Sequence, residues 1–166
     1  MTAIPGDVLL VPGDPAKRID QLVMRDTGSR FVHAALVFAR PLPPASPAPL
    51  VIEAVWPRVR LAADAYAGAV VVAPPYPDEA ARHRAVTYAL GRVGDRYDGL
   101  GLALQAAYRW PPTRRPARRA LDRWTRLPLF WCSELVCRAL REAGLAPPCA
   151  ADVCSPGDLA RWLGVA

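Results

Sequence analysis

The sequence predicts a single α+β domain in which a small antiparallel β-sheet packs against helices. Apolar runs with strand character follow one another through the first half of the chain, and most of the helical patterns come after them, an order that suits a meandering sheet better than alternating parallel strands. The 166 residues are 52% hydrophobic and contain no internal repeat. One domain spanning 1–166 with a sizeable core is therefore expected.

Five strands are expected. The run "HAALVFA" (33–39) ends at the proline-rich "RPLPPASPAP" and predicts a strand entering a loop, and "LVIEAV" (50–55) is an apolar run rich in β-branched residues. In chain order the expected strands are 7–11, 32–39, 50–55, 58–61 and 69–73.

Four helices accompany these strands. The stretch "PDEAARHRAVTYALGRV" (77–93) has an amphipathic pattern with Ala80, Val86, Ala89 and Leu90 inward, and "SPGDLARWL" (155–163) introduces a closing helix. The expected helices are 16–25, 78–91, 132–143 and 155–163.

The helix over 132–143 places a cysteine at its opening. Pro128 cannot lie in a helix interior, and Ser133 and Glu134 suit a first turn, so Cys132 falls at the N-terminus. Partial positive charge at a helix N-terminus favours a thiolate, and with a nearby cation it lowers a cysteine pKa from about 8.5 to roughly 3.5–7.5. The alternative is a small core residue, because free cysteine is often buried.

The chain has two histidines that could serve as a base for this thiol. His83 lies between arginines on an amphipathic helix and is expected in solvent. His33 opens the apolar strand over 33–39. We therefore expect His33 to be the partner of Cys132.

Glu53 interrupts the apolar strand over 50–55. An unpaired buried carboxylate costs several kcal/mol, so Glu53 should have a partner. It would face His33 if the hairpin centre lies near Pro43, and the alternative is a solvated glutamate on an edge strand.

Cys132, His33 and Glu53 together supply a nucleophile, a base and a residue that orients the base, which is the arrangement used in acyl transfer. The sequence contains no glycine-rich phosphate loop, no H-E-x-x-H and no G-x-S-x-G motif. The triad is therefore the chemistry that the sequence favours.

These motifs resemble a known family. The segments "PGDVLLV", the His33 strand, "VIEAV", "RYDG" (96–99) and "CSELV" (132–136) stand in the order seen in YiiX-like proteins, in the circularly permuted branch of NlpC-type, papain-like cysteine peptidases, to which lecithin:retinol acyltransferase is related. The resemblance implies a permuted papain-like fold, Cys132 as nucleophile, His33 as base and Glu53 as the third polar residue. Tyr97 matches the family's "YD" pair and is expected to bind substrate or assist the oxyanion.

The remaining cysteines, Cys137, Cys149 and Cys154, are expected to be packing or surface thiols. The C-x4-C spacings are loose for a zinc site, so a structural zinc is the weaker alternative, and we expect no metal or cofactor. The first residues lack an export signal and no long apolar stretch occurs, so the chain as given is expected to be cytoplasmic with reduced thiols.

A basic insertion at about 100–131 departs from the family pattern. Its part from Arg109 to Arg126 holds seven arginines and one acid, which equals the net charge of +6 of the whole chain. Pro116 can start a helix with an apolar face of Ala117, Ala120, Leu121, Trp124 and Leu127. Such a helix suggests contact with an anionic membrane through Arg115, Arg118, Arg119, Arg123 and Trp124, the alternative being a helix packed on its own core; no nucleic-acid partner is expected.

The sequence thus predicts a cysteine hydrolase or acyltransferase acting on an amide or ester bond of a peptide, N-acyl or lipid substrate. The alternative is a binding protein that holds a lipid or peptide in the same cleft without turnover.

Overall fold

The computed structural model describes residues 3–40, 48–63, 66–109, 111–124, 129–147 and 149–165, apart from the side chains of 102, 105, 106, 109, 111 and 122–124. The described strands are β1 (Val8–Pro12), β2 (Phe31–Ala39), β3 (Leu50–Val55), β4 (Arg58–Ala62), β5 (Val70–Val72), β6 (Arg96–Tyr97) and β7 (Leu129–Phe130). The helices are α1 (Arg18–Thr27), α2 (Glu79–Leu90), α3 (Gly99–Arg109), α4 (Arg114–Trp124), α5 (Cys132–Glu142) and α6 (Pro156–Trp162), with 3₁₀ turns at Pro111–Thr113 and Ala151–Val153. The predicted α+β class is confirmed.

The strands form one twisted sheet of order β5-β1-β2-β3-β4-β6-β7. The five expected strands are present with ends that differ by at most one residue from the prediction. The expectation of a purely antiparallel sheet is wrong at one edge, where β6 pairs with β7 in parallel. Two-residue strands carry no periodic apolar pattern, so backbone pairing reveals them and the sequence does not.

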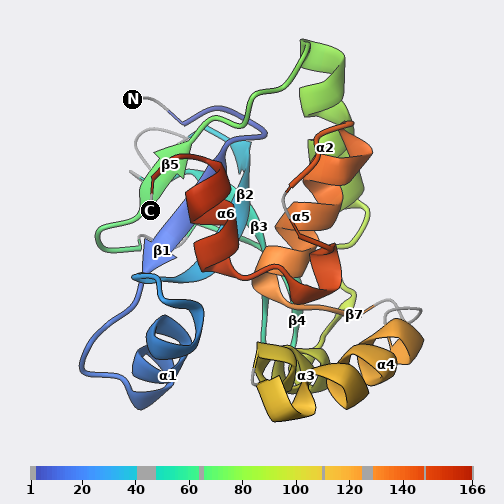
Figure 1. Ribbon diagram of the computed structural model, residues 1–166. Coiled ribbons are helices and arrows are strands. Elements are labelled where there is room, and N and C mark those ends of the chain that lie inside the picture. Colours follow the sequence, from blue (N-terminus) through green and yellow to red (C-terminus); the bar gives the residue numbers. More distant parts are fainter. Residues whose placement is uncertain are drawn as a thin grey trace.

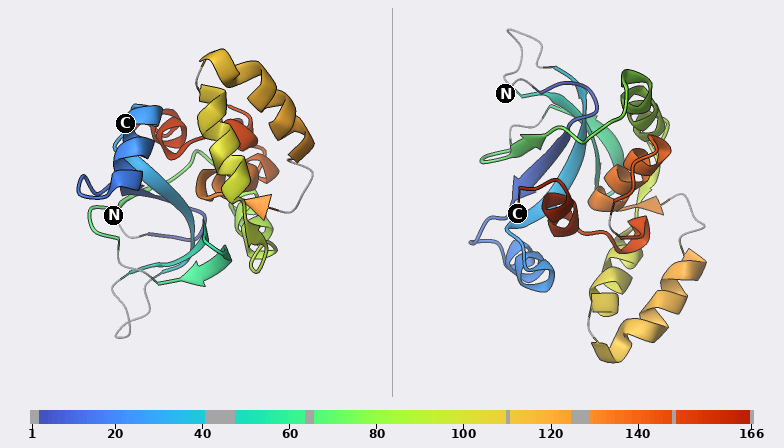
Figure 2. Two further views of the ribbon diagram at one scale, coloured as in Figure 1. Left: turned by 90° about the horizontal axis from the view of Figure 1, so that it is seen from below. Right: turned by 45° about the horizontal axis from the view of Figure 1, so that its top comes forward.

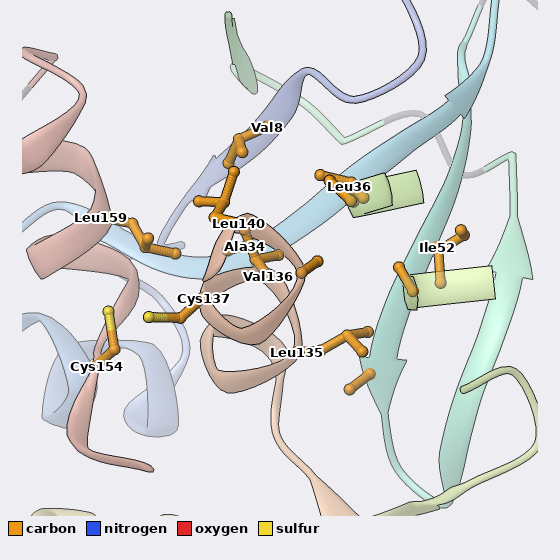
Figure 3. Packing of buried hydrophobic residues seen from close by; sticks show 14 of the residues in the cluster. Val8, Ala34, Leu36, Ile52, Leu135, Val136, Cys137, Leu140, Cys154 and Leu159 are labelled. Atoms are coloured by element: carbon orange, nitrogen blue, oxygen red, sulfur yellow. The ribbon is translucent and has the colours of Figure 1, made fainter. Parts of the chain in front are cut away.

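Helices cover one face of the sheet (Figure 1). Side chains alternate along each strand, so Leu10, Leu36 and Ile52 point into a core shared with α2, α5 and α6. Figure 3 shows how the stripe of α5 meets this face, with Leu135, Val136 and Leu140 beside Ala34, Leu36 and Ile52. The opposite face packs a smaller cluster that includes Leu9, Ala35, Val37 and Val51.

The inward face of α2 agrees with the prediction at Val86 and Ala89 and differs from it at Ala80 and Leu90. Ala81, Ala85 and Ala89 are fully buried, whereas Ala80 and Leu90 are exposed. A stripe of alanines lets α2 approach α5 closely, and this packing decides the rotation of the helix where the apolar pattern is ambiguous.

The basic insertion forms two helices that lie side by side, α3 and α4 (Figure 2). The latter begins at Arg114, before the predicted start at Pro116, because a proline is tolerated in a first turn. Its residues Ala117 and Leu121 are buried, and Leu121 packs against Trp131. The part of the apolar face formed by Ala117 and Leu121 is therefore covered by the rest of the protein, whereas Leu127 and the side chain of Trp124 lie outside the described residues. No helix in the described segments is long and apolar enough to span a bilayer.

Candidate active site

Cys132 is the first residue of α5 and is only 8% exposed. Trp131 before it is extended, with φ −99° and ψ 173°, which turns the chain from β7 into the helix. The carbonyl of Cys154 accepts hydrogen bonds from Ser133 Oγ at 2.7 Å and Trp131 Nε1 at 3.4 Å. These two bonds tie the start of α5 to the chain entering α6.

His33 on β2 lies between the thiol and a carboxylate. Its Nε2 is 2.8 Å from Glu53 Oε2, and its ring also hydrogen-bonds Cys132. Because Nε2 is engaged by Glu53, Nδ1 is the nitrogen that faces the sulfur. The structure thus brings together all three predicted residues.

The strand register differs slightly from the prediction. Leu36 pairs with Ile52, and the same register places Glu53 beside Ala35 and diagonal to His33. A hairpin centred near Pro43 would place the two side chains directly opposite each other. In the structure they are not directly opposite. The shift keeps both on the same face of the sheet, where diagonal neighbours remain within reach of long side chains.

Glu53 is fully buried, which excludes the solvated alternative. Its Oε1 accepts hydrogen bonds from Arg60 Nε at 3.0 Å and Nη2 at 2.8 Å, and its Oε2 accepts from Tyr66 Oη as well as from His33. Burial raises the pKa of Glu53, but the bonds from His33, Tyr66 and Arg60 outweigh it and lower the pKa overall.

Sequence reasoning missed both Arg60 and Tyr66. Arg60 pairs directly with Glu53 across the short β3–β4 turn at Trp56 and Pro57, so a tight turn at these two residues would have predicted that contact. Tyr66 lies outside the strands and helices, and the centre of its ring is 5.7 Å from that of His33. No periodic signal identifies such a residue.

The pKa values of Cys132 and His33 depend on each other. Burial alone raises the pKa of the thiol and lowers that of the imidazole. Their hydrogen bond and mutual attraction reverse both effects, so the pKa of Cys132 is lowered and that of His33 is raised to about 10. The backbone N–H groups of Ala34 and Ser133 also lower the pKa of the thiol. Each group therefore favours the charged form of the other.

Tyr97 lies in the same pocket as Cys132, where the sequence placed it. Burial, followed by the negative charges of Cys132 and Asp98, raises its pKa, so its phenol keeps its proton. The adjacent Asp98 is buried and accepts a hydrogen bond of 2.6 Å from the N–H of Gly101 in the first turn of α3. That bond fixes the start of α3 next to Tyr97.

Glu134, treated as an ordinary first-turn acid, is nearly fully buried. Its Oε1 lies 2.6 Å from Arg138 Nη2, whereas Oε2 has no hydrogen-bond partner among the described residues. Burial raises its pKa to about 7, against the attraction of Arg138 and with a further contribution from Asp98. Its burial depends on tertiary packing that the sequence does not reveal.

A pocket of about 640 Å³ opens beside the triad, between α1, the β3–β4 turn and the start of α3. Cys132, His33 and Tyr97 are among the residues that line it. A carbonyl group entering the pocket would meet the sulfur, and the pocket is large enough for a small organic ligand.

The other candidate residues lie away from this pocket. His83 is exposed on α2, as predicted. Cys137 and Cys154 are buried and Cys149 is partly exposed, and all are free thiols that interact with one another. No group of three or more His, Cys, Asp or Glu in the described segments is arranged to hold a metal ion.

Charged residues of α4 contact the domain as well as solvent. Arg118 forms an ion pair of 3.2 Å with Asp152, whereas Arg115 and Arg119 are exposed. The side chains of Arg123 and Trp124, also predicted to bind a membrane, lie outside the described residues.

A scan against models of protein families found no match, and no curated protein matches the sequence.

Proposed function

We propose that this protein is a cysteine hydrolase or acyltransferase, of permuted papain-like architecture, that acts on an amide or ester bond. The observation that carries the proposal is the contact between Cys132, His33 and Glu53, with His33 Nε2 2.8 Å from Glu53 Oε2 and the thiol hydrogen-bonded to the same ring. The resemblance of the five sequence motifs to YiiX-like proteins points to the same chemistry.

The first half-reaction forms an acyl-enzyme. The Cys132 thiolate attacks the carbonyl carbon, and the carbonyl oxygen takes the negative charge. We assign the stabilisation of that oxyanion to the N–H groups at the start of α5 and to the Tyr97 hydroxyl. The C–N or C–O bond then breaks as the His33 imidazolium gives its proton to the leaving nitrogen or oxygen.

The second half-reaction releases the acyl group. Neutral His33 takes a proton from water, whose oxygen attacks the thioester, and the C–S bond breaks to restore the thiolate and imidazolium. In a transferase, an amine or alcohol takes the place of water. Glu53 keeps the imidazole oriented throughout, and Arg60 and Tyr66 fix Glu53.

The test is turnover of simple activated esters and amides, together with intact-mass detection of an acyl group on Cys132. Wild-type protein should release product and carry a transient thioester, and Cys132→Ala and His33→Ala should each abolish release while keeping the circular-dichroism spectrum. Cys149→Ser, which alters a partly exposed thiol outside the pocket, is the matched control and should retain activity.

The competing function is binding without turnover. A protein that only holds its ligand would form no thioester and would release product no faster than buffer. Near wild-type turnover in Cys132→Ala or in His33→Ala would overturn the catalytic assignment.

A further inference from the structure

A second pocket, of about 430 Å³, lies between α2, α4, α5 and the 3₁₀ turn at Ala151–Val153. None of the described residues lines both this pocket and the one beside Cys132. Helices α2 and α5 stand side by side (Figure 1), and α4 closes the pocket with a side chain of the basic insertion. Its lining includes Arg118 of α4, Arg138 and Arg141 of α5, and Tyr88 of α2. Positive side chains from two helices therefore converge on one cavity.

Contacts with the protein hold these guanidinium groups in place. Arg118 Nη1 lies 3.2 Å from Asp152 Oδ2, and Arg141 Nη2 donates a hydrogen bond of 2.7 Å to the carbonyl of Cys149. The side chain of Arg118 is still 38% exposed, so its ion pair does not enclose it. Side chains that are already oriented lose less conformational freedom when a ligand binds. The arginines of this pocket are therefore prepared for an anion.

The charge of the lining also favours an anion. Three arginines face two acids, Asp152 and Glu142. The further acid that pairs with Arg138 is Glu134, and burial raises its pKa to about 7, so near neutral pH it compensates that arginine only in part. The bond from Arg141 to a backbone carbonyl fixes its guanidinium without neutralising it. The cavity therefore keeps excess positive charge.

We propose that this pocket binds a phosphate group, carried by a small soluble ester or by a lipid headgroup. Guanidinium groups form paired hydrogen bonds with phosphate oxygens. A phosphate monoester carries between one and two negative charges near neutral pH, so it suits several arginines better than a single carboxylate does. The volume falls within the range of small-ligand pockets, about 300–1,000 Å³, and leaves room for the group attached to the phosphate. The bound phosphate bridges α4 and α5, and so joins the basic insertion to the helix that begins at Cys132.

The test is isothermal titration calorimetry with glycerol 3-phosphate and with inorganic phosphate, in sodium chloride of about 0.15 M. Both phosphates should bind, and glycerol should not. Arg141→Gln should weaken the binding at least about tenfold, because it removes a charge-assisted hydrogen bond. Arg25→Gln, which removes the same charge from an exposed position on α1, is the matched control and should bind like wild type.

Two further variants locate the site. His33→Ala should bind both phosphates like wild type, because the imidazole belongs to the other pocket. Thermal melts check that the variants fold. If Arg141→Gln unfolds, Arg118→Gln replaces it and should weaken the binding to a similar extent.

Sedimentation with phosphatidylcholine vesicles, with and without phosphatidic acid, distinguishes the two sources of the phosphate. A lipid headgroup is the source if Arg141→Gln loses the binding to phosphatidic acid vesicles that wild type shows. A soluble ester is the source if Arg141→Gln changes only the binding of the soluble phosphates.

The inference is independent of the proposed function. It would be overturned if neither soluble phosphate bound, or if Arg141→Gln and wild type bound them equally well. Loss of binding in His33→Ala alone would place the anion in the pocket beside Cys132 and overturn the inference as well.

Discussion

Cys132 and Cys137 lie on the same helix, and the pKa of each thiol is lowered by a hydrogen bond. The partner of Cys132 is the imidazole of His33, whereas the partner of Cys137 is the thiol of Cys154. Figure 3 shows Cys137 and Cys154 turned toward each other beside the core. Hydrogen bonds from Cys137 and Cys149, together with burial, raise the pKa of Cys154.

The two thiols differ in access and in the base beside them. Cys132 lines a pocket, and its neighbour can carry a proton to a leaving group. Cys137 is fully buried, and its neighbour is another weak acid. A lowered pKa is therefore not enough to make a catalytic cysteine; the thiol also needs an open path and a base.

The largest change should come from removing that base. Without His33, burial drives the pKa of Cys132 above the ordinary value of about 8.5, so we expect iodoacetamide to alkylate Cys132 roughly 100-fold more slowly at pH 6.5 in His33→Ala. Mass spectrometry of tryptic peptides gives the rate at each thiol. His83→Ala is the control and should match wild type, and equal rates in all three proteins would mean that His33 does not activate the thiol.

Losses of the same size or smaller are expected from the residues behind His33. Glu53→Gln should lower kcat/KM roughly 100-fold, because an amide can present a donor to His33 and upset its tautomer. Tyr66→Phe removes one hydrogen bond to the charged carboxylate and should cost about tenfold. Thermal melts check folding, and unchanged kinetics in Glu53→Gln would make this residue a bystander.

The contacts of Glu53 show which partners can be predicted from the sequence and which cannot. A carboxylate inside an apolar strand needs a partner because burying it unpaired is costly. His33 on the adjoining strand can be predicted as that partner. The identity of the further partners depends on register at β4 and on the path of the chain at Tyr66, which are tertiary facts. The same applies to β6 and β7 and to the rotation of α2, which alanine packing decides.

The buried thiols test the comparison between Cys132 and Cys137, with a smaller expected effect. In the native protein, iodoacetamide should modify Cys132 first and the partly exposed Cys149 next, with Cys137 and Cys154 protected until denaturant is added. Cys137→Ala should lower the free energy of unfolding by about 1 kcal/mol through lost packing and leave Cys132 alkylation unchanged. Rapid native labelling of Cys137 would contradict the role assigned to burial.

The weakest expected effect concerns α4. Exposed arginines gain roughly 1 kcal/mol each near an anionic surface, so vesicles containing anionic lipid should bind the protein at low salt and release it as salt rises. Sedimentation should show reduced binding for Arg115→Gln/Arg119→Gln. Arg118 stays intact in this test because it pairs with Asp152.

The control for α4 is Arg40→Gln/Arg84→Gln, which removes the same charge elsewhere and should bind like wild type. If the wild-type protein does not bind anionic vesicles at low salt, α4 is a packed structural element. The burial of Leu121 favours that interpretation.

The buried Glu134 makes folding a proton-uptake reaction. Its pKa rises from 4.5 in the unfolded chain to about 7 in the native state, so the native state binds the proton more tightly. The stability it contributes is full below pH 4.5 and is lost as the pH rises through about 7, a change of about 3 kcal/mol. Glu134→Gln should flatten this part of the pH–stability curve in urea titrations. Helix α5, which begins at Cys132, is thus held more firmly in mild acid than in mild base, opposite to the trend for most carboxylates.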